Sequence, residues 1–332
     1  MILYKLKVGD SLNISVLGCG RWGSFIAWYL NKIGHNVMLW GRTGSVHLNE
    51  LIKNRKNEFL NFDDKIQFTD SLKTALGFSD VIVVSISAQS FRDFFADVVK
   101  ICDVSDKTFV LCMKGLEQST GKRLSQIVQE IAGENQKVAV WVGPGHVQDF
   151  EKGIPNCMVI DSPFIEVKNR LVKEFSSSLI RFYYGTDMIG TEVGAAAKNV
   201  MGIAAGILDG MGFESLKGAL MSRGTYEISK LISAMGGNAP SAYGLAHLGD
   251  YQATLFSQHS NNRLFGESLV KKSDCKKLAE GAMTSDALVK LGNDLNVDLP
   301  ICAAVNKIVF GKLEPQQALK ELFERSTQQE FN

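Results

Sequence analysis

The feature that most constrains this chain is a glycine-rich turn within residues 14–42, ISVLGCGRWGSFIAWYLNKIGHNVMLWGR. A β-rich apolar run precedes the glycines, and an amphipathic helical segment and a second apolar run follow them. Gly18, Gly20 and Gly23 form G-x-G-x-x-G. In that pattern the glycines allow a tight turn, close approach of backbone to a pyrophosphate, and packing of helix on strand, while the helix N-terminus attracts the anion. The sequence therefore predicts a dinucleotide site. The alternative is a glycine-rich connection that binds nothing.

The end of the second apolar run indicates which dinucleotide is bound. An acidic residue about 20 positions after the glycines usually holds a ribose 2′-hydroxyl, whereas an arginine accommodates a 2′-phosphate. Here Arg42 follows Trp40 and Gly41, and the first acidic residue after it is Glu50. Because guanidinium is planar and always charged, Arg42 can stack on adenine and pair with a phosphate. We predict a preference for NADP(H), with NAD(H) still usable. The alternative for Arg42 is a solvated loop residue.

Composition excludes several classes of protein. The 332 residues include 36 basic and 35 acidic side chains, for a net charge of +1, which is not the pattern of a nucleic-acid-binding or membrane-surface protein. No apolar run reaches the roughly 18 residues of a membrane span, and the N-terminal MILYKLKVGDSLN lacks a signal-peptide pattern, so we expect a cytoplasmic protein. The cysteines form no C-x-x-C pairs and the histidines are dispersed, so we expect reduced cysteines and no metal site. The cysteines are Cys19, Cys102, Cys112, Cys157, Cys275 and Cys302.

The first half of the chain alternates short β-rich runs with helical segments. Beyond the two runs above, the expected strands are KIQFT (65–69), DVIVVSIS (80–87), TFVLCMKGL (108–116), KVAVWVGPG (137–145), CMVIDS (157–162) and LIRFYYG (179–185), with helices near 91–101 and 120–132. Near-continuous apolar runs are typical of strands buried on both faces, so the alternation predicts an α/β Rossmann-type doubly wound parallel sheet. Ligands in such sheets bind beyond the carboxyl ends of strands, where residues 85–89, Lys114 and 143–147 are expected.

Helical periodicity replaces strands after about residue 187, which predicts a dinucleotide-binding domain over 1–187 and an all-α domain over 188–332. Residues 191–212, TEVGAAAKNVMGIAAGILDGMG, predict a slim helix that packs closely at the centre of the second domain. Lys198 and Asn199 are its polar break and face either solvent or an enclosed cleft. The glycine-bounded segment GLAHLGDYQATLFSQHSNNRLFG (244–266) adds functional side chains, namely Asp250, Thr254, Asn261, Asn262 and Arg263.

Taken together, these segments resemble the bacterial NAD(P)-dependent glycerol-3-phosphate dehydrogenase family. The resemblance runs through nearly the whole chain, in order and spacing: GCGRWG, LWGR, KGLE (114–117) with TG (120–121), GAAAKNVMGIAAGILDG, SRGTYEISKL (222–231) and GLAHLGD (244–250). It implies a Rossmann-type domain followed by a helical domain similar to that of 6-phosphogluconate dehydrogenase, in a homodimer. It also implies NADPH-dependent reduction of dihydroxyacetone phosphate to sn-glycerol 3-phosphate, and the reverse, supplying phospholipid synthesis.

The resemblance implies a role for each site residue. Lys198 would accept the proton of the substrate hydroxyl and return it in the reverse direction. Lys114 would contact the substrate oxygen and cofactor, and Asp250 would orient Lys198 or the substrate hydroxyls; the alternative for Asp250 is a helix N-cap or turn residue. Arg21 and Trp22 would flank the pyrophosphate and Glu280 would reach the cofactor ribose. The remaining implied contacts are Val147 and Asn261 to the cofactor, and Gly143, Gly145, Asn199, Ser260, Asn261 and Asn262 to the substrate.

Two positions depart from the family pattern. The family usually has G-P-S/T-F-A after its sixth strand, with a hydroxyl on the substrate, but this chain has Gly145 there. The family usually has S-R-N near position 260, whose arginine clamps the substrate phosphate; here Asn261 replaces it, and Arg263 follows. The changes keep open a family paralogue that reduces a different small ketone or aldehyde, and a non-catalytic NADP(H) sensor. His146 or His259 as a replacement donor would make substrate binding depend on pH near about 6.5; the alternative for both is a packing or surface role.

Overall fold

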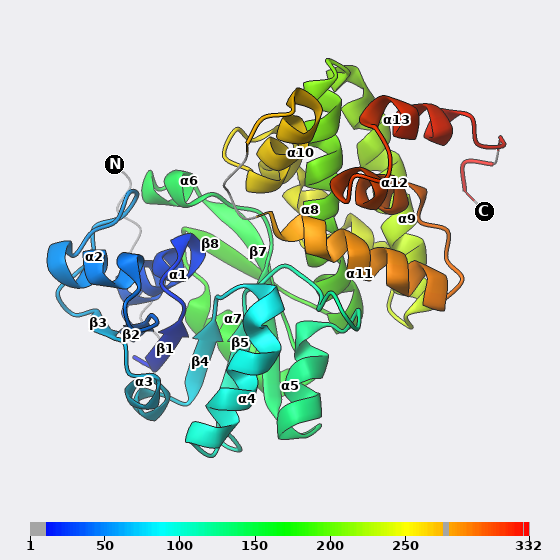
Figure 1. Ribbon diagram of the computed structural model, residues 1–332. Coiled ribbons are helices and arrows are strands. Elements are labelled where there is room, and N and C mark those ends of the chain that lie inside the picture. The colour runs from blue at the N-terminus through cyan, green and yellow to red at the C-terminus, as the bar shows by residue number, and fades with distance from the viewer. Residues whose placement is uncertain (1–10, 275–278, 328, 332) are drawn as a thin grey trace. The chain divides into compact units, whose positions relative to one another are not determined.

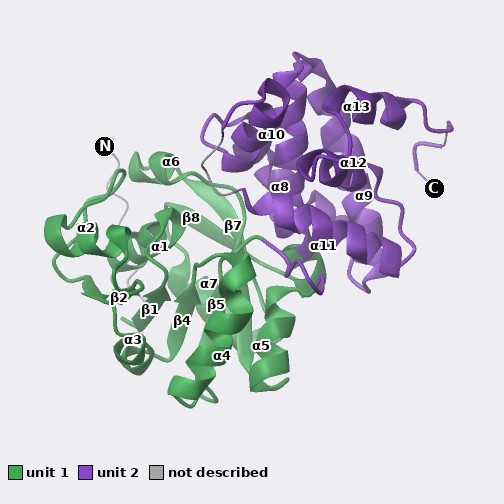
Figure 2. Cartoon of the chain, viewed as in Figure 1, with its two compact units in different colours: residues 1–114, 122–192 green, residues 115–121, 193–332 purple. Residues whose placement is uncertain are grey.

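The computed structural model describes residues 11–274, 279–327 and 329–331. The chain forms two compact units, which Figure 2 colours separately. Unit 1 comprises residues 1–114 and 122–192, and unit 2 comprises residues 115–121 and 193–332. The helix α8 (Met188–Gly210) begins in unit 1 and continues into unit 2. The predicted division at residues 187 and 188 stays a prediction.

Unit 1 is built on an eight-stranded sheet with the order β3-β2-β1-β4-β5-β6-β7-β8 (Figure 1). The strand bounds are β1 (Asn13–Leu17), β2 (Asn36–Trp40), β3 (Gln67–Thr69), β4 (Val81–Val84), β5 (Thr108–Leu111), β6 (Lys137–Val142), β7 (Asn156–Asp161) and β8 (Ile180–Tyr184). Strand β1 pairs in parallel with both β2 and β4, so that Ser15 lies opposite Met38 on one side and Ile82 on the other. The strand order reverses at β1, as in doubly wound sheets. The predicted Rossmann-type fold is confirmed.

One pair of strands corrects the prediction of a parallel sheet. Strands β6 and β7 run antiparallel, with Trp141 opposite Ile160. The connection between them holds only the five-residue helix α6 (Val147–Glu151). The helices α4 and α5, which connect β4 to β5 and β5 to β6 in the parallel part of the sheet, have 11 and 9 residues, so β6 and β7 lack a crossover helix of that length.

Helices cover both faces of the sheet. One hydrophobic cluster includes side chains of α1 (Arg21–Lys32), α2 (Val46–Asn54), α6 and α7 (Ile165–Phe175), and the other those of α3 (Leu72–Phe78), α4 (Phe91–Ile101) and α5 (Leu124–Ala132). A short 3₁₀ turn, η1 (Ala88–Ser90), precedes α4. Because successive strand residues point to opposite faces, Val83 belongs to the first cluster and Val84 to the second.

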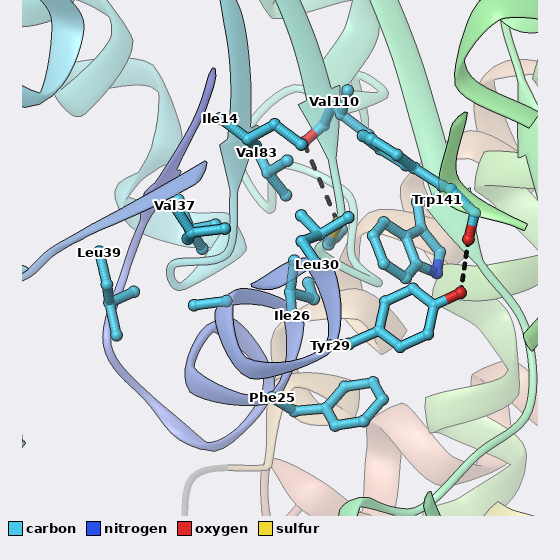
Figure 3. Close-up of a cluster of buried hydrophobic side chains, with 14 of the residues drawn as sticks. Ile14, Phe25, Ile26, Tyr29, Leu30, Val37, Leu39, Val83, Val110 and Trp141 are labelled. Carbon is cyan, nitrogen blue, oxygen red and sulfur yellow. Dashed lines mark hydrogen bonds between the residues drawn. The ribbon is translucent and has the colours of Figure 1, made fainter. Parts of the chain in front are cut away.

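Helix α1 shows how the sequence produces this packing. Its large side chains at 22, 25, 26, 29 and 30 have the i, i+3, i+4, i+7, i+8 spacing of one helical face. Figure 3 shows Phe25, Ile26, Tyr29 and Leu30 among strand residues of the sheet. The Tyr29 ring meets that of Trp141 edge-on, with centroids 5.9 Å apart. This packing holds the helix that follows the glycine turn firmly against the sheet.

Unit 2 consists of helices packed around α8, and none of its described residues forms a strand. Its other α-helices are α9 (Lys217–Ala234), α10 (Asn261–Lys271), α11 (Glu280–Asp294), α12 (Pro300–Val309) and α13 (Pro315–Phe323). Its short turns are η2 (Glu214–Leu216), η3 (Ala239–Tyr243), η4 (Leu248–Asp250) and the π-helix η5 (Gln252–Phe256). Residues 191–208 are all buried, so α8 is enclosed on every side, as the predicted central helix requires. A Cβ at Gly206 would overlap the carbonyl oxygen of Arg263 on α10. The close approach of α10 therefore explains why α8 has a glycine at this position.

A buried carboxylate holds the start of α12 in unit 2. Glu227 of α9 is 3% exposed and accepts hydrogen bonds from the backbone N–H groups of Ile301 and Cys302, at 2.8 and 2.9 Å. It therefore caps orphan donors of the α12 N-terminus. Burial raises the pKa of Glu227 to about 7, although the two N–H groups act in the opposite direction.

Within the described residues, no helix combines the length and the apolar character needed to cross a membrane. No group of three or more His, Cys, Asp or Glu side chains in that part of the chain is placed to hold a metal ion. The described cysteines are free thiols, and Cys275 lies outside the described residues.

Candidate active site

The predicted site residues fall into two groups, one in each unit. Unit 1 carries those of the glycine turn and of the strand ends β2, β5 and β6. Unit 2 carries those of α8, of the turns before α10, and of the starts of α10 and α11. Each group is described within its own unit. The members of each group are Gly18, Gly20, Arg21, Trp22, Gly23, Arg42, Lys114, Gly143, Gly145 and Val147 in unit 1, and Lys198, Asn199, Asp250, Ser260, Asn261, Asn262 and Glu280 in unit 2.

The glycine turn has the geometry of a pyrophosphate cradle. Gly18 has φ of +118°, and a Cβ there would overlap the carbonyl oxygen of Ser85. A Cβ at Gly23 would overlap the carbonyl oxygen of Gly18, so only glycine lets α1 approach β1 this closely. Gly20 is the N-cap of α1 without a side-chain cap, and nothing lies within 4 Å of where its Cβ would be. The turn therefore leaves uncapped N–H groups beside open space, as binding of a dinucleotide phosphate requires.

The side chains around this turn also suit a nucleotide. The indole Nε1 of Trp22 is buried and has no hydrogen-bond partner in the described chain. Because buried donors are normally satisfied, this N–H fits an acceptor such as a cofactor oxygen. Arg21 lies over the ring of Phe59, 4.8 Å from its centroid. Arg42 lies two residues past β2 and is exposed, so its guanidinium can reach a bound adenosine. The residues present therefore fit NAD(P).

Lys114, Gly143 and Trp22 come together at the carboxyl edge of the sheet. Lys114 lies three residues past β5, and its Nζ donates a hydrogen bond of 2.7 Å to the carbonyl oxygen of Gly143, just past β6. The same Nζ lies 5.7 Å from the centroid of the Trp22 ring. Because β5 and β6 are neighbours, their ends bring these sequence-distant residues together.

The loop after Gly143 explains one departure from the family pattern. Gly145 has φ of +156°, and a Cβ there would overlap Cε2 of Phe150 and lie 2.6 Å from its Cζ. The Phe150 ring is 1% exposed and stacks on Phe25 of α1 at a centroid distance of 4.8 Å. Phe150 therefore occupies the space that a serine or threonine side chain would need, a coupling that the sequence does not reveal. Val147 begins α6 with its side chain in the hydrophobic core, which leaves only its backbone for the predicted cofactor contact.

Lys198 lies in an enclosed polar cluster, which settles the choice between solvent and cleft. It is 8% exposed, and its Nζ lies 2.9 Å from Oδ2 of Asp250 and donates a hydrogen bond of 2.8 Å to Oγ1 of Thr254. Thr254 in turn donates to the backbone carbonyl of Asp250 at 2.8 Å. Asp250 ends η4 and Thr254 lies in η5, a π-helix, an element rare in proteins and frequent at functional sites. Asp250 thus binds the lysine and also ends the short turn η4, and its predicted role in the reaction stays a prediction.

The start of α10 carries Asn261, where the family usually has an arginine, and also Arg263. Ser260 is the N-cap and accepts a hydrogen bond from the N–H of Arg263, and Asn261 is the first helical residue. The Nε of Arg263 lies 2.5 Å from Oδ2 of Asp209, whose Oδ1 lies 2.5 Å from Nζ of Lys217. This carboxylate holds the Arg263 guanidinium, so Arg263 does not take the place of an arginine at position 261.

Asn262 has a structural contact that the sequence did not suggest. Its Oδ1 accepts a hydrogen bond of 3.0 Å from the N–H of Gly281, in the first turn of α11. A Cβ at Gly281 would lie 2.6 Å from the carbonyl oxygen of Asn199, so α11 packs directly on α8 beside the site lysine. Glu280, expected at the ribose, is the first residue of α11. The predicted ligand contacts of Asn199, Asn262 and Glu280 stay predictions.

Residues 115–121, which follow Lys114, belong to unit 2 and contact α11 there. Gln118 donates to Asp286 of α11 at 3.2 Å, and the hydroxyl of Thr120 bonds the carboxylate of Glu117. A Cβ at Gly121 would lie 2.9 Å from Cγ of Leu291. Strand β5 ends at Leu111 and not at 116, as the apolar run suggested.

Comparison with known proteins decides the family. The family model described as NAD-dependent glycerol-3-phosphate dehydrogenase N-terminus matches residues 13–167, and its C-terminus counterpart matches residues 187–320. The chain belongs to the NAD-dependent glycerol-3-phosphate dehydrogenase family. The family resemblance read from the sequence is confirmed.

Curated members of the family match this chain over its length. A glycerol-3-phosphate dehydrogenase [NAD(P)+] of Pelodictyon phaeoclathratiforme is 34% identical over 332 aligned residues, covering 96% of this chain and 99% of the relative. That of Fusobacterium nucleatum is also 34% identical, with the same coverage. Among solved structures, glycerol-3-phosphate dehydrogenase from Coxiella burnetii matches with a TM-score of 0.88 at 28% identity, over 95% of this chain and 99% of that one. The Plasmodium falciparum structure, at 17% identity and a TM-score of 0.83, shares the fold.

Proposed function

We propose that this protein catalyses the NAD(P)-dependent interconversion of dihydroxyacetone phosphate and sn-glycerol 3-phosphate. The observation that carries the proposal is the buried Lys198, bonded to Asp250 at 2.9 Å and to Thr254 at 2.8 Å. A fixed, enclosed lysine beside a carboxylate suits proton transfer to and from a substrate oxygen. The full-length relatives that carry this activity in their names support the same substrate.

The cradle of Gly18, Gly20 and Gly23, with Trp22 and Arg42, would hold the dinucleotide. When bound, NAD(P) supplies or accepts the hydride at the substrate carbon. In the reducing direction Lys198 delivers a proton to the carbonyl oxygen, and in the oxidising direction its amine takes the hydroxyl proton. Asp250 stabilises the protonated amine and fixes its direction, and Thr254 holds it from a second side. Lys114, held by Gly143, would contact the substrate oxygen as a second donor.

Several finer features belong to the proposal. Arg42 and the absence of an acid before Glu50 favour NADPH, and hence the reducing direction. Reduction yields a glycerol phosphate for phospholipid synthesis. We further propose a cytoplasmic homodimer, which rests on the family resemblance.

A second candidate is a paralogue in the same family with a different small ketone or aldehyde as substrate. It is favoured by one departure from the family pattern in the sequence, Asn261, and by two observations in the structure: Arg263 is bound by Asp209, and Phe150 excludes a side chain at Gly145. Loss of one charge-assisted hydrogen bond of about 1.5–3 kcal/mol weakens phosphate binding by about ten- to a hundredfold. The non-catalytic sensor stays the least supported alternative, because Lys198 is present and is bonded to Asp250 and Thr254.

Steady-state oxidation of NADPH with dihydroxyacetone phosphate, compared with unphosphorylated dihydroxyacetone, tests the proposal. We expect kcat/KM to favour the phosphate by about a thousandfold or more, equivalent to about 4 kcal/mol. Lys198→Met should lower kcat by more than tenfold with little change in NADPH affinity. A preference below about tenfold would support the paralogue, and binding of NADPH without turnover of any ketone would support the sensor. A substrate KM that is flat from about pH 5.5 to 8 would exclude His146 and His259 as donors.

A further inference from the structure

A buried histidine lies behind the lysine cluster of unit 2. His247 is 0% exposed and precedes η4. Its Nδ1 lies 2.8 Å from the carbonyl oxygen of Gly194, and its Nε2 lies 2.7 Å from the hydroxyl of Tyr251. Because a carbonyl only accepts, Nδ1 carries the proton, and a neutral ring then accepts from the Tyr251 hydroxyl at Nε2. Burial lowers the pKa of His247 to about 4, which keeps the ring neutral at physiological pH.

The hydrogen bond between His247 and Gly194 lies next to the proposed proton-transfer pair, Lys198 and Asp250. Gly194 and Lys198 are four residues apart on α8, so they lie on the same face of the helix. His247 is three residues before Asp250, and its carbonyl oxygen accepts the Asp250 N–H at 3.0 Å. A Cβ at Gly194 would lie 3.0 Å from Cβ of His247, so the glycine allows the turn this close to the helix. The pairs Gly194–His247 and Lys198–Asp250 therefore join the same two elements at neighbouring points.

We propose that His247 is a positioning residue, which fixes the turn carrying Asp250 and Thr254 against α8 and so holds the Lys198 amine in line for proton transfer. Its hydrogen bond to Gly194 sets the register between turn and helix, and Tyr251 keeps the ring in the orientation that this bond requires. His247 does not touch Lys198 through any described hydrogen bond and acts through Asp250 and Gly194. The inference rests on the proposed role of Lys198 in the reaction.

The test compares His247→Leu, which removes both hydrogen bonds, with His247→Gln, which can donate to Gly194 and accept from Tyr251. We expect His247→Leu to lower kcat by about ten- to a hundredfold, with the KM for dihydroxyacetone phosphate and the Kd for NADPH within about twofold of wild type. The pH profile of kcat should also shift, because the contact between Lys198 and Asp250 is loosened. His247→Gln should recover most of kcat and the wild-type profile.

His35→Leu is the matched control. His35 is 5% exposed, and its Nε2 lies 3.0 Å from the carbonyl oxygen of Glu174 in unit 1. It is nearly as buried as His247 and also contacts a backbone carbonyl, so it reports the effect of losing a buried histidine outside the lysine cluster. We expect a lower melting temperature in both leucine variants but a lower kcat only in His247→Leu. Equal kcat in folded His247→Leu and wild type, with an unchanged pH profile, would overturn the proposal.

A second variant and a second readout keep the test decisive. If His247→Leu does not fold, Tyr251→Phe removes only the hydroxyl that holds the ring, and a kcat within about 10% of wild type would equally refute the positioning role. Acetylation of Lys198 by acetic anhydride, followed by mass spectrometry with Lys217 as internal reference, needs no turnover. We expect labelling of Lys198 to rise several-fold over wild type in His247→Leu, or in Tyr251→Phe if His247→Leu does not fold. If wild type turns over no ketone but labelling still rises, the proposed substrate fails while the positioning role stands.

Discussion

Gly145→Ser should destabilise unit 1, although it restores a residue that the family usually has at this position. The new Cβ would overlap Cε2 of Phe150 and lie 2.6 Å from Cζ, where carbon atoms normally stay about 3.5–4.0 Å apart. The ring cannot move aside easily, because it is 1% exposed and stacked on Phe25 at 4.8 Å. Overpacking of this kind costs about 1–3 kcal/mol. For a unit of this size each kcal/mol lowers Tm by about 2–4 °C, so we expect a fall of about 2–12 °C.

The assay is thermal unfolding of wild type, Gly145→Ser and Gly153→Ser. Gly153 has φ of +79° and nothing within 4 Å of its Cβ position, so its variant reports the backbone cost without a clash. Combining Gly145→Ser with Phe150→Leu should relieve the overlap, giving a double-mutant coupling of about 1 kcal/mol or more. A Gly145→Ser protein that melts within about 1 °C of wild type, or a coupling near zero, would refute the argument that Phe150 excludes a side chain at position 145.

Three further changes test other contacts. Arg42→Ala should weaken NADPH by about ten- to a hundredfold and NADH by much less, because only NADPH carries the 2′-phosphate; equal losses in Kd would contradict the assignment. Asn261→Arg should raise kcat/KM for dihydroxyacetone phosphate by about tenfold or more while leaving unphosphorylated dihydroxyacetone unchanged, and equal changes for both would show that position 261 does not meet the phosphate. Burial raises the pKa of Glu227 from 4.5 to about 7, so the folded state binds this proton more tightly than the unfolded state. The free energy of unfolding should therefore fall by about 3 kcal/mol as pH rises from about 4.5 to 7, and Glu227→Gln should remove that fall in urea unfolding; an equal pH dependence in both proteins would contradict it.

The positions of the strands were predicted well from the sequence, because strands buried on both faces consist of near-continuous apolar runs. Some strand ends were misplaced for the same reason. Past Leu111 the apolar residues Cys112, Met113 and Leu116 are still buried although the chain has left the sheet, and past Val84 the half-buried Ile86 extended the predicted strand in the same way. The antiparallel β7 was missed because the apolar pattern of a strand is the same in both directions and does not show which way the strand runs.

Site residues could be predicted where they form a motif of neighbouring residues in the sequence. They could not be predicted where their role depends on a partner far away in the chain. The glycine spacing identified the dinucleotide turn directly. The partner of Lys198 was predicted, but only through the family resemblance, since Asp250 is 52 positions further along the chain. His247 was overlooked because its hydrogen bond reaches Gly194, on a different helix. Its i, i+4 spacing to Tyr251 was the one signal in the sequence that could have pointed to it.

The burial of α8 on every side has a consequence for which positions of this chain can be changed without loss of the fold. Residues 191–208 have no exposed face, and even a methyl group at Gly206 would collide with the α10 backbone. Larger side chains on this helix should therefore be strongly destabilising, and this close packing holds Lys198 in a fixed place. Residues 257–259 are exposed or half-buried, and we expect them to tolerate replacement better than the helix does. Both departures from the family pattern lie outside this helix, Gly145 in the loop before α6 and Asn261 at the first position of α10, so neither changes a residue of the helix that carries Lys198.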